Sequence, residues 1–217
     1  MQGFVFQNPT KIVFGCGCIP KVGKYALEQG RKALLLYGSG SIKANGIYDQ
    51  VTASLRQAGI QWVEHSGVKS NPVLSHTREG IELAKAQQVD MVIPVGGGSV
   101  LDEGKAIAAG AMTDGDVWDF FINKAQVEAA LPLVTVLTLA ATASEMNNGG
   151  VVTNEATAQK FNINSPWLFP KVSILDPEAT YTVAADYTAY SGVDAISHLI
   201  EGYFTSSDPY TPLQDRL

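Results

Sequence analysis

Short apolar runs alternate with segments of helical periodicity along most of the chain, and this alternation limits the folds that the chain can adopt. The runs lie at residues 33–37, 91–95, 133–137 and 172–175, and a further strand is predicted at 61–64. A strand that is apolar along its whole length is buried on both faces, as in a parallel sheet covered by helices. We therefore expect an α/β fold with a mainly parallel sheet and helices on both faces.

Helices are predicted between these strands at 47–58, at 74–88 and from Lys105 to about Ala109. Pro94 lies inside the strand at 91–95, where a proline removes a hydrogen-bond donor from the ladder. Two hairpins are also predicted. One pairs residues 4–6 with 11–14, and the other pairs residues 149–152 with 160–163.

From Asp186 onward the pattern is helical only, and a helix is predicted over residues 190–205. Its apolar side chains recur at helical spacing on one side, at Val193, Ile196, Ile200, Tyr203 and Phe204. The pattern breaks off soon afterwards, so we expect this chain to be the first part of a longer protein.

Composition excludes several classes of partner. Lys and Arg total 15 against 21 Asp and Glu, giving a net charge of -6, and no stretch is dense in basic residues. Nucleic acid and membrane surfaces are therefore not expected as partners. Cys16 and Cys18 are too close together for an ordinary disulfide, which favours a reducing compartment. With no signal peptide and no long apolar run, we expect a soluble, cytoplasmic protein.

The strongest chemical signal is Gly96-Gly97-Gly98-Ser99 between a predicted strand and a predicted helix. Adjacent glycines let the backbone approach a phosphate, and the N–H groups at a helix start attract anions. The alternative is a tight turn in which Ser99 caps the helix. Leu101 stands where G-x-G-x-x-G has its third glycine, so this is not the usual dinucleotide fingerprint. A second glycine turn, at residues 38–41, could line the same crevice.

Two further groups of residues could carry chemistry. Hydroxyl side chains follow the fourth apolar run in residues 138–145, where they could bind a ribose or a phosphate, or cap their own loop. Asp194 and His198 lie one helical turn apart and could hold a divalent metal. Their spacing alone favours an ordinary exposed pair. His65 and His76 are isolated in the sequence and are interpreted as satisfied or surface histidines.

Taken together, the motifs resemble those of iron-containing (group III) alcohol dehydrogenases, in particular their NADPH-dependent butanol dehydrogenase and aldehyde reductase branch. The resemblance rests on five motifs in order: Asn71-Pro72, residues 96–102 with Lys105, residues 138–145, Asp176-Pro177 and residues 192–198. It covers the whole chain but only about the front half of a typical family member.

The resemblance implies a Rossmann-like dinucleotide-binding domain at residues 1–183 and the beginning of an all-helical, metal-binding domain at 184–217. It implies that a nicotinamide dinucleotide is bound by Gly38, Ser39, Ser41, Asn71, Gly97, Gly98, Ser99, Asp102, Thr138, Thr142, Ser144 and Lys160. Asp194 and His198 match two of the four ligands of the catalytic metal, which would be iron, zinc or a similar divalent ion. The other two ligands are histidines of the helical half, which this chain lacks.

The predicted function is metal-dependent hydride transfer between primary alcohols and aldehydes. NADP(H) is expected rather than NAD(H), because NAD-preferring relatives carry an Asp where this chain has Gly38-Ser39, and a carboxylate would repel a 2′-phosphate. Two alternatives remain open. One is another enzyme of the same fold, similar to glycerol dehydrogenase or dehydroquinate synthase, and the other is a non-catalytic nucleotide-binding fragment. A homodimer is expected, with residues 4–6 offering an unpaired strand edge.

Overall fold

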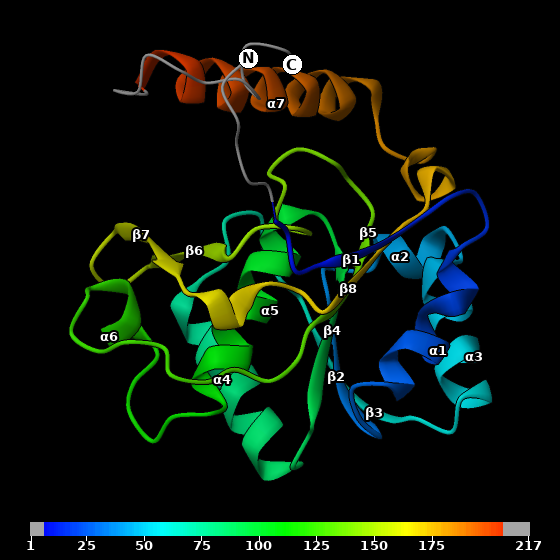
Figure 1. The fold of residues 1–217 in the computed structure, drawn as a ribbon, viewed down its shortest axis with the longest axis horizontal. Helices are drawn as coiled ribbons and strands as arrows, with labels where there is room; N and C mark the ends of the chain where they lie inside the picture. Colours follow the sequence, from blue (N-terminus) through cyan, green and yellow to red (C-terminus); the bar gives the residue numbers. More distant parts are fainter. Residues whose placement is uncertain (1–6, 206–217) are drawn as a thin grey trace.

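The computed structural model describes residues 7–205, and six parallel strands of this part form one twisted sheet (Figure 1). The spatial order is β1, β8, β5, β4, β2, β3. The strands are β1 (Lys11–Phe14), β2 (Lys32–Tyr37), β3 (Gln61–Ser66), β4 (Met91–Gly96), β5 (Val134–Leu137) and β8 (Val172–Leu175). The predicted α/β fold is therefore confirmed, with the predicted strands shifted by at most two residues.

Helices cover both faces of the sheet because both faces are apolar. Alternate residues of β2 point to opposite sides, so Leu34 and Leu36 belong to one buried cluster and Leu35 to the other. The Leu35 side is covered by α1 (Val22–Leu27) and α3 (Ile47–Gln57). The other side is covered by α4 (Leu74–Ala86) and α5 (Gly98–Gly110).

Pro94 lies in the middle of the sheet, and the ladder opens beside it. Val92 donates its N–H to Pro132 of the chain segment before β5, and the ladder resumes only at Val95 and Val136. Pro94 has no N–H for the bond that would lie between them. The strand survives because its other side pairs with β2 without a break, including Pro94 with Leu36.

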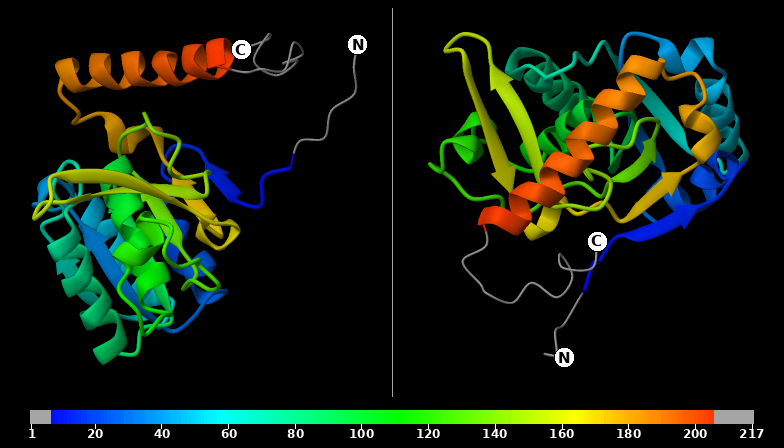
Figure 2. Two further views of the ribbon diagram at one scale, coloured as in Figure 1. Left: turned by 90° about the vertical axis from the view of Figure 1, so that its left-hand side faces the viewer. Right: turned by 90° about the horizontal axis from the view of Figure 1, so that it is seen from above.

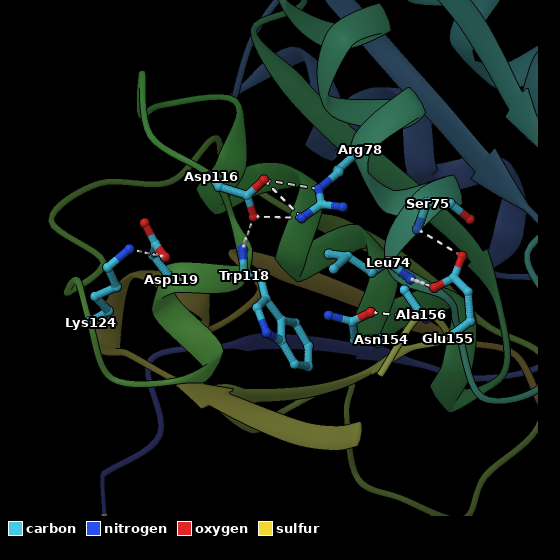
Figure 3. A network of polar contacts seen from close by, with 10 residues as sticks. All are labelled: Leu74, Ser75, Arg78, Asp116, Trp118, Asp119, Lys124, Asn154, Glu155 and Ala156. Carbon is cyan, nitrogen blue, oxygen red and sulfur yellow. Dashed lines mark hydrogen bonds and ion pairs between the residues drawn. The ribbon is translucent and has the colours of Figure 1, made fainter. Parts of the chain in front are cut away.

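The hairpin predicted before the last strand is confirmed as β6 (Gly149–Asn154) paired antiparallel with β7 (Gln159–Asn164). Its turn docks on α4, because Glu155 accepts hydrogen bonds from the N–H groups of Leu74 and Ser75 at 3.1 and 3.3 Å (Figure 3). Arg78 of α4 binds Asp116 with two nitrogens and so joins α4 to the segment before α6 (Trp118–Phe121).

The N-terminal hairpin prediction is half outside the described residues. Residues 11–14 form a strand as expected, but β1 pairs in parallel with β8 and is an edge of the sheet that the described residues form. Residues 4–6 lie outside the described range. Short elements escaped prediction because they span one turn each: α2 (Ser41–Ala44), α6, and 3₁₀ turns at Ile19–Lys21, Pro166–Leu168 and Pro177–Thr180.

The last described element is α7 (Ala185–Thr205), which begins five residues before the predicted helix and lies across the carboxyl ends of the strands (Figures 1 and 2). Several of its apolar side chains are exposed, with Val193, Ile196 and Ile200 each about half exposed or more and Phe204 77% exposed. None of the described helices is long and apolar enough to cross a lipid bilayer.

Candidate functional site in the crevice at the carboxyl ends of the strands

The topology leaves a crevice between β2 and β4. The chain leaves β2 toward β3 at one edge and leaves β4 toward β5 on the opposite side, although β2 and β4 are neighbours. Ligands of open α/β sheets bind at such a reversal, outside the carboxyl ends of the strands. Both predicted glycine turns lie there, residues 38–41 after β2 and Gly97 and Gly98 after β4.

The second turn presents free backbone donors. Gly97 is extended, with φ -83° and ψ -174°, and α5 begins at Gly98. Val100 and Leu101 donate to the carbonyl of Gly97, whereas within the described residues the N–H groups of Gly98 and Ser99 have no acceptor. Free N–H groups at the start of a thirteen-residue helix form an anion-binding position.

The alternative in which Ser99 caps this helix is wrong. Gly97 is the N-cap and Ser99 is the second residue of α5, so its hydroxyl cannot reach forward to close the first turn. The Ser99 Oγ instead accepts a hydrogen bond from the N–H of Asn71 at 3.3 Å. Ser99 thereby joins the glycine turn to the segment between β3 and α4.

Two clefts open beside the glycine turn, and Ser99 lines both. The first has a volume of about 470 Å³ and includes Ser41, Lys69, Gly97, Gly98 and Thr138. The second has a volume of about 360 Å³, and its lining includes Asn71, Asp102, Thr142, Lys160, Asp194 and His198. Eleven of the fourteen residues that the resemblance selects therefore gather in this crevice, although they come from segments spread along the chain.

Three of the selected residues do not line either cleft. Gly38 and Ser39 belong to the first glycine turn, of which only Ser41 contributes to the lining. Ser144 is 1% exposed, and its hydroxyl donates to Asp102 Oδ1 at 2.6 Å. Ser144 can therefore act on a bound molecule only through Asp102.

Asp102 connects α5 to the β6–β7 hairpin. Its Oδ1 accepts from Ser144 and its Oδ2 accepts from the N–H of Val151 at 3.0 Å. Burial raises the pKa of Asp102, although the Ser144 hydrogen bond and the charge of Lys105 oppose the shift. The carboxylate is thus a fixed wall of the second cleft.

Lys105 was part of a recognised motif, but sequence reasoning gave it no role. Its side chain is fully buried, and Nζ donates to the carbonyls of Asn147 and Gly149 and to the Asn147 side-chain oxygen at 2.6–3.0 Å. Burial lowers the pKa of Lys105 to about 8, against the effect of Asp102 and Glu145. A lysine among the alanines of a buried helix was the available sequence signal.

Asp194 and His198 face the second cleft from α7. The distance between Asp194 Oδ2 and His198 Nε2 is 3.7 Å, and both side chains are about half exposed. An oxygen and a nitrogen donor at this separation suit a divalent transition metal. A catalytic zinc site uses three protein ligands, so these two residues form only part of a metal site. Within residues 7–205, the one three-ligand cluster is elsewhere, at His65, His76 and Glu103.

The sheet topology, the glycine turn and the clefts define an α/β chain of the dinucleotide-binding type. Residues 9–177 match the family model of iron-containing alcohol dehydrogenases. The chain belongs to this family.

Known relatives agree with this assignment. The chain is 49% identical over its whole length to a probable NADH-dependent butanol dehydrogenase of Bacillus subtilis, and covers 56% of that protein. Over 94% of its length it is 35% identical to the NADPH-dependent aldehyde reductase of Escherichia coli, covering 53% of it. The crystal structure of NADH-dependent butanol dehydrogenase A of Thermotoga maritima matches 96% of this chain with a TM-score of 0.93, and the two sequences are 56% identical. The match covers 53% of the Thermotoga chain. This chain therefore spans about half the length of these relatives.

Proposed function

We propose that the protein containing this chain is a metal-dependent oxidoreductase that interconverts primary alcohols and aldehydes by hydride transfer with NADP(H). One observation carries the proposal. Ser99 lines both the cleft beside the free N–H groups of the glycine turn and the cleft that holds Asp194 and His198. An anionic dinucleotide and a metal-bound substrate would therefore meet in one crevice.

In this proposal the N–H groups of Gly98 and Ser99 bind the pyrophosphate. Ser41 and Thr138 offer hydroxyls to the riboses, while Asn71, Thr142 and Lys160 line the path toward α7. Asp102, held by Ser144 and Val151, keeps the wall of the second cleft in place. Gly38 and Ser39 shape the turn that carries Ser41.

Asp194 and His198 would hold the divalent metal, iron or zinc or a similar ion, with further ligands from outside the described residues. When bound, such an ion supplies Lewis acidity that polarises the carbonyl oxygen of an aldehyde. The two side chains lie on one face of α7, so the helix fixes their separation. Small alcohols and aldehydes are the proposed substrates, in agreement with the names of the relatives.

The preference for NADP(H) rests on the charges at the end of β2. Gly38 and Ser39 carry no carboxylate. The nearby Glu64 binds the hydroxyls of Tyr37 and Tyr48, and the Lys43 ammonium lies 3.5 Å from it. The Glu64 carboxylate is therefore partly neutralised, and the turn at Gly38 and Ser39 carries no negative charge. Neither would strongly repel a 2′-phosphate. The relatives named above include both NADH-dependent and NADPH-dependent enzymes, so competition between the two cofactors is the deciding test.

The full-length protein should reduce butanal with NADPH, and Asp194→Ala should lower turnover more than about a hundredfold while leaving NADPH affinity unchanged. Asp186→Ala is the matched control, because Asp186 is an exposed carboxylate at the start of the same helix. Unchanged turnover in Asp194→Ala would remove the metal assignment. A higher kcat/KM with NADH than with NADPH would reverse the cofactor preference.

We also propose a cytoplasmic homodimer. Cys16 and Cys18 are both free thiols, as a reducing compartment requires. β1 is an edge strand whose Phe14 is 72% exposed, which makes this edge available to a second copy. Light scattering on the full-length protein and on Phe14→Glu tests the dimer, and a dimer that survives the substitution would exclude this edge.

A further inference from the structure

Three side chains from α5, α4 and β3 form a compact cluster. Glu103 is fully buried on α5, His76 belongs to the first turn of α4, and His65 lies on β3. The rings of His65 and His76 stack with centroids 4.0 Å apart. The two histidines are satisfied, as the sequence suggested, but they are not isolated from each other.

Both ring nitrogens of His76 face oxygen atoms. Nε2 lies 3.0 Å from the carbonyl oxygen of Ser66, and Nδ1 lies 2.5 Å from Glu103 Oε1. A carbonyl can only accept, so Nε2 carries a proton. The bond between Nδ1 and Glu103 needs a second proton, which belongs either to an imidazolium or to a carboxylic acid. In both cases the pair holds two protons and its net charge is zero.

Removing the shared proton would change the pair sharply. The Nδ1 lone pair would then face a carboxylate, and an uncompensated negative charge would remain on a fully buried side chain. Glu103 Oε2 is buried and has no hydrogen-bond donor among the described residues, so nothing there stabilises the added negative charge. Among the described residues, the other titratable groups acting on the pair are His65 of β3 and the exposed Glu79 of α4.

The pair holds both ends of the segment that faces the proposed dinucleotide. Residues 67–73 leave β3 at Ser66 and enter α4 two residues before His76. Val68, Lys69 and Ser70 of this segment line the first cleft, and Asn71 lines the second. His76 binds Ser66 at one end of the segment, and Glu103 anchors it to the helix that begins at the glycine turn.

We propose that His76 and Glu103 are a positioning pair that shares one proton, and that this proton holds residues 67–73 against the glycine turn so that the crevice binds its dinucleotide. This inference rests on the proposed function. The stabilising effect of the pair is complete while the shared proton is bound and is lost when that proton is removed.

Binding of NADPH to the full-length protein, followed by fluorescence from pH 6 to pH 10, tests the proposal. Glu103→Gln replaces the shared proton with an amide N–H, which can donate to a neutral Nδ1 at every pH. Glu103→Leu removes the bond altogether. Glu82→Gln is the matched control, because Glu82 is an exposed carboxylate further along α4.

As the pH rises to 10, we expect the NADPH affinity of the wild-type protein and of Glu82→Gln to fall about tenfold further than that of Glu103→Gln. A factor of ten corresponds to one pH unit of difference in protonation. Glu103→Leu should bind weakly at all pH values. Lys105 also titrates in this range, but it is present in all the variants and cancels in the comparison. Identical pH profiles for the wild-type protein and Glu103→Gln would overturn the proposal.

Two further measurements do not depend on dinucleotide binding. The wild-type protein should show a far-downfield proton resonance that is absent from Glu103→Gln and from His76→Asn, and its absence from the wild-type protein would overturn the shared proton. The second measurement is the zinc content of Asp194→Ala and of the double variant that also carries Glu103→Gln. If Asp194→Ala retains zinc and the double variant loses it, a metal occupies the place of the shared proton, and the proposal is overturned. If NADPH and NADH fail to bind at every pH, the proposed function and the role of the segment fail together, while the resonance still reports the pair.

Discussion

Lys160 of the β6–β7 hairpin donates a hydrogen bond of 2.7 Å to the side-chain oxygen of Asn71, a residue 89 positions earlier in the chain. Asn71 in turn donates its N–H to Ser99 at the glycine turn. The hairpin and the β3–α4 segment are therefore tied together at the mouth of the second cleft, where both side chains line the wall.

Lys160→Met should weaken NADPH binding about tenfold, which corresponds to ~1.4 kcal/mol, because it removes both a cation from the crevice and the bond that orients Asn71. The free energy of unfolding should change little, since the side chain is exposed. Fluorescence titration and urea unfolding measure the two quantities. Lys171→Met is the control, as an exposed lysine at the opposite end of the sheet, and equal binding by both variants would contradict the expectation.

Lys105→Met should destabilise the protein by about 3 kcal/mol. The substitution keeps the buried alkyl chain but leaves the oxygens of Asn147 and Gly149 without their donor. Asn147 belongs to the loop that carries Thr142 and Ser144 beside Asp102, and Gly149 begins β6, so NADPH affinity should fall as well. Thermal unfolding and fluorescence titration would measure the effects.

The control for this change is Lys124→Met, which removes a lysine that is 70% exposed and pairs with Asp119 at the surface. Its unfolding free energy should stay within about 0.5 kcal/mol of the wild-type value. Similar stability losses in both variants would show that the buried hydrogen bonds of Lys105 are not what holds the loop.

Most of the fold was predictable because its signals are local. Apolar runs such as residues 33–37 and 91–95 indicate strands buried on both faces, and the glycines after them mark where the chain turns. The strand predicted at residues 91–95 forms despite Pro94. A strand tolerates a missing N–H donor in one ladder when its other ladder is complete. Strand order and the parallel pairing of β1 with β8 involve distant segments and left no local signal.

The site was predictable to the extent that its residues belong to motifs. Position in a motif does not say whether a side chain reaches the crevice, and Ser144 is turned toward Asp102 while Gly38 and Ser39 stay outside the clefts. The cluster of His65, His76 and Glu103 left no pattern in the sequence, because the residues come from three elements and meet only after the helices pack.

Glu155→Ala should destabilise the protein by about 1 kcal/mol, the usual effect of removing a side-chain acceptor at a helix start. Figure 3 shows Glu155 reaching from the hairpin turn to the first N–H groups of α4. Hydrogen bonding to Ser75 holds the pKa of Glu155 below its ordinary value of 4.5. Its stabilisation is therefore complete above pH 4.5 and is lost as the pH falls through the lowered pKa.

Urea unfolding at pH 7 and at pH 3 measures this difference. The gap between the wild-type protein and Glu155→Ala should be largest at pH 7 and should narrow at pH 3. Glu128→Ala serves as the control, because Glu128 is exposed and lies outside the hairpin turn. A gap that is the same at both pH values would show that the carboxylate charge is not involved.

Gly98→Ala should cost about 1–3 kcal/mol of stability and should also weaken dinucleotide binding, because the added methyl group would overlap the side chain of Thr142. Gly97→Ala is the matched control. A methyl group there would lie 3.4 Å from Leu139, an ordinary contact, and the extended backbone of Gly97 accepts an alanine. We expect the unfolding free energy of Gly97→Ala to remain close to the wild-type value.

The double variant with Gly98→Ala and Thr142→Ala separates sterics from backbone effects. Removing the hydroxyl and methyl groups of Thr142 makes room for the new methyl group, so most of the lost stability should return in thermal unfolding. Binding should return less completely, because Thr142 lines the second cleft. If the double variant is no more stable than Gly98→Ala, the close approach of Thr142 is not the reason that this position needs a glycine.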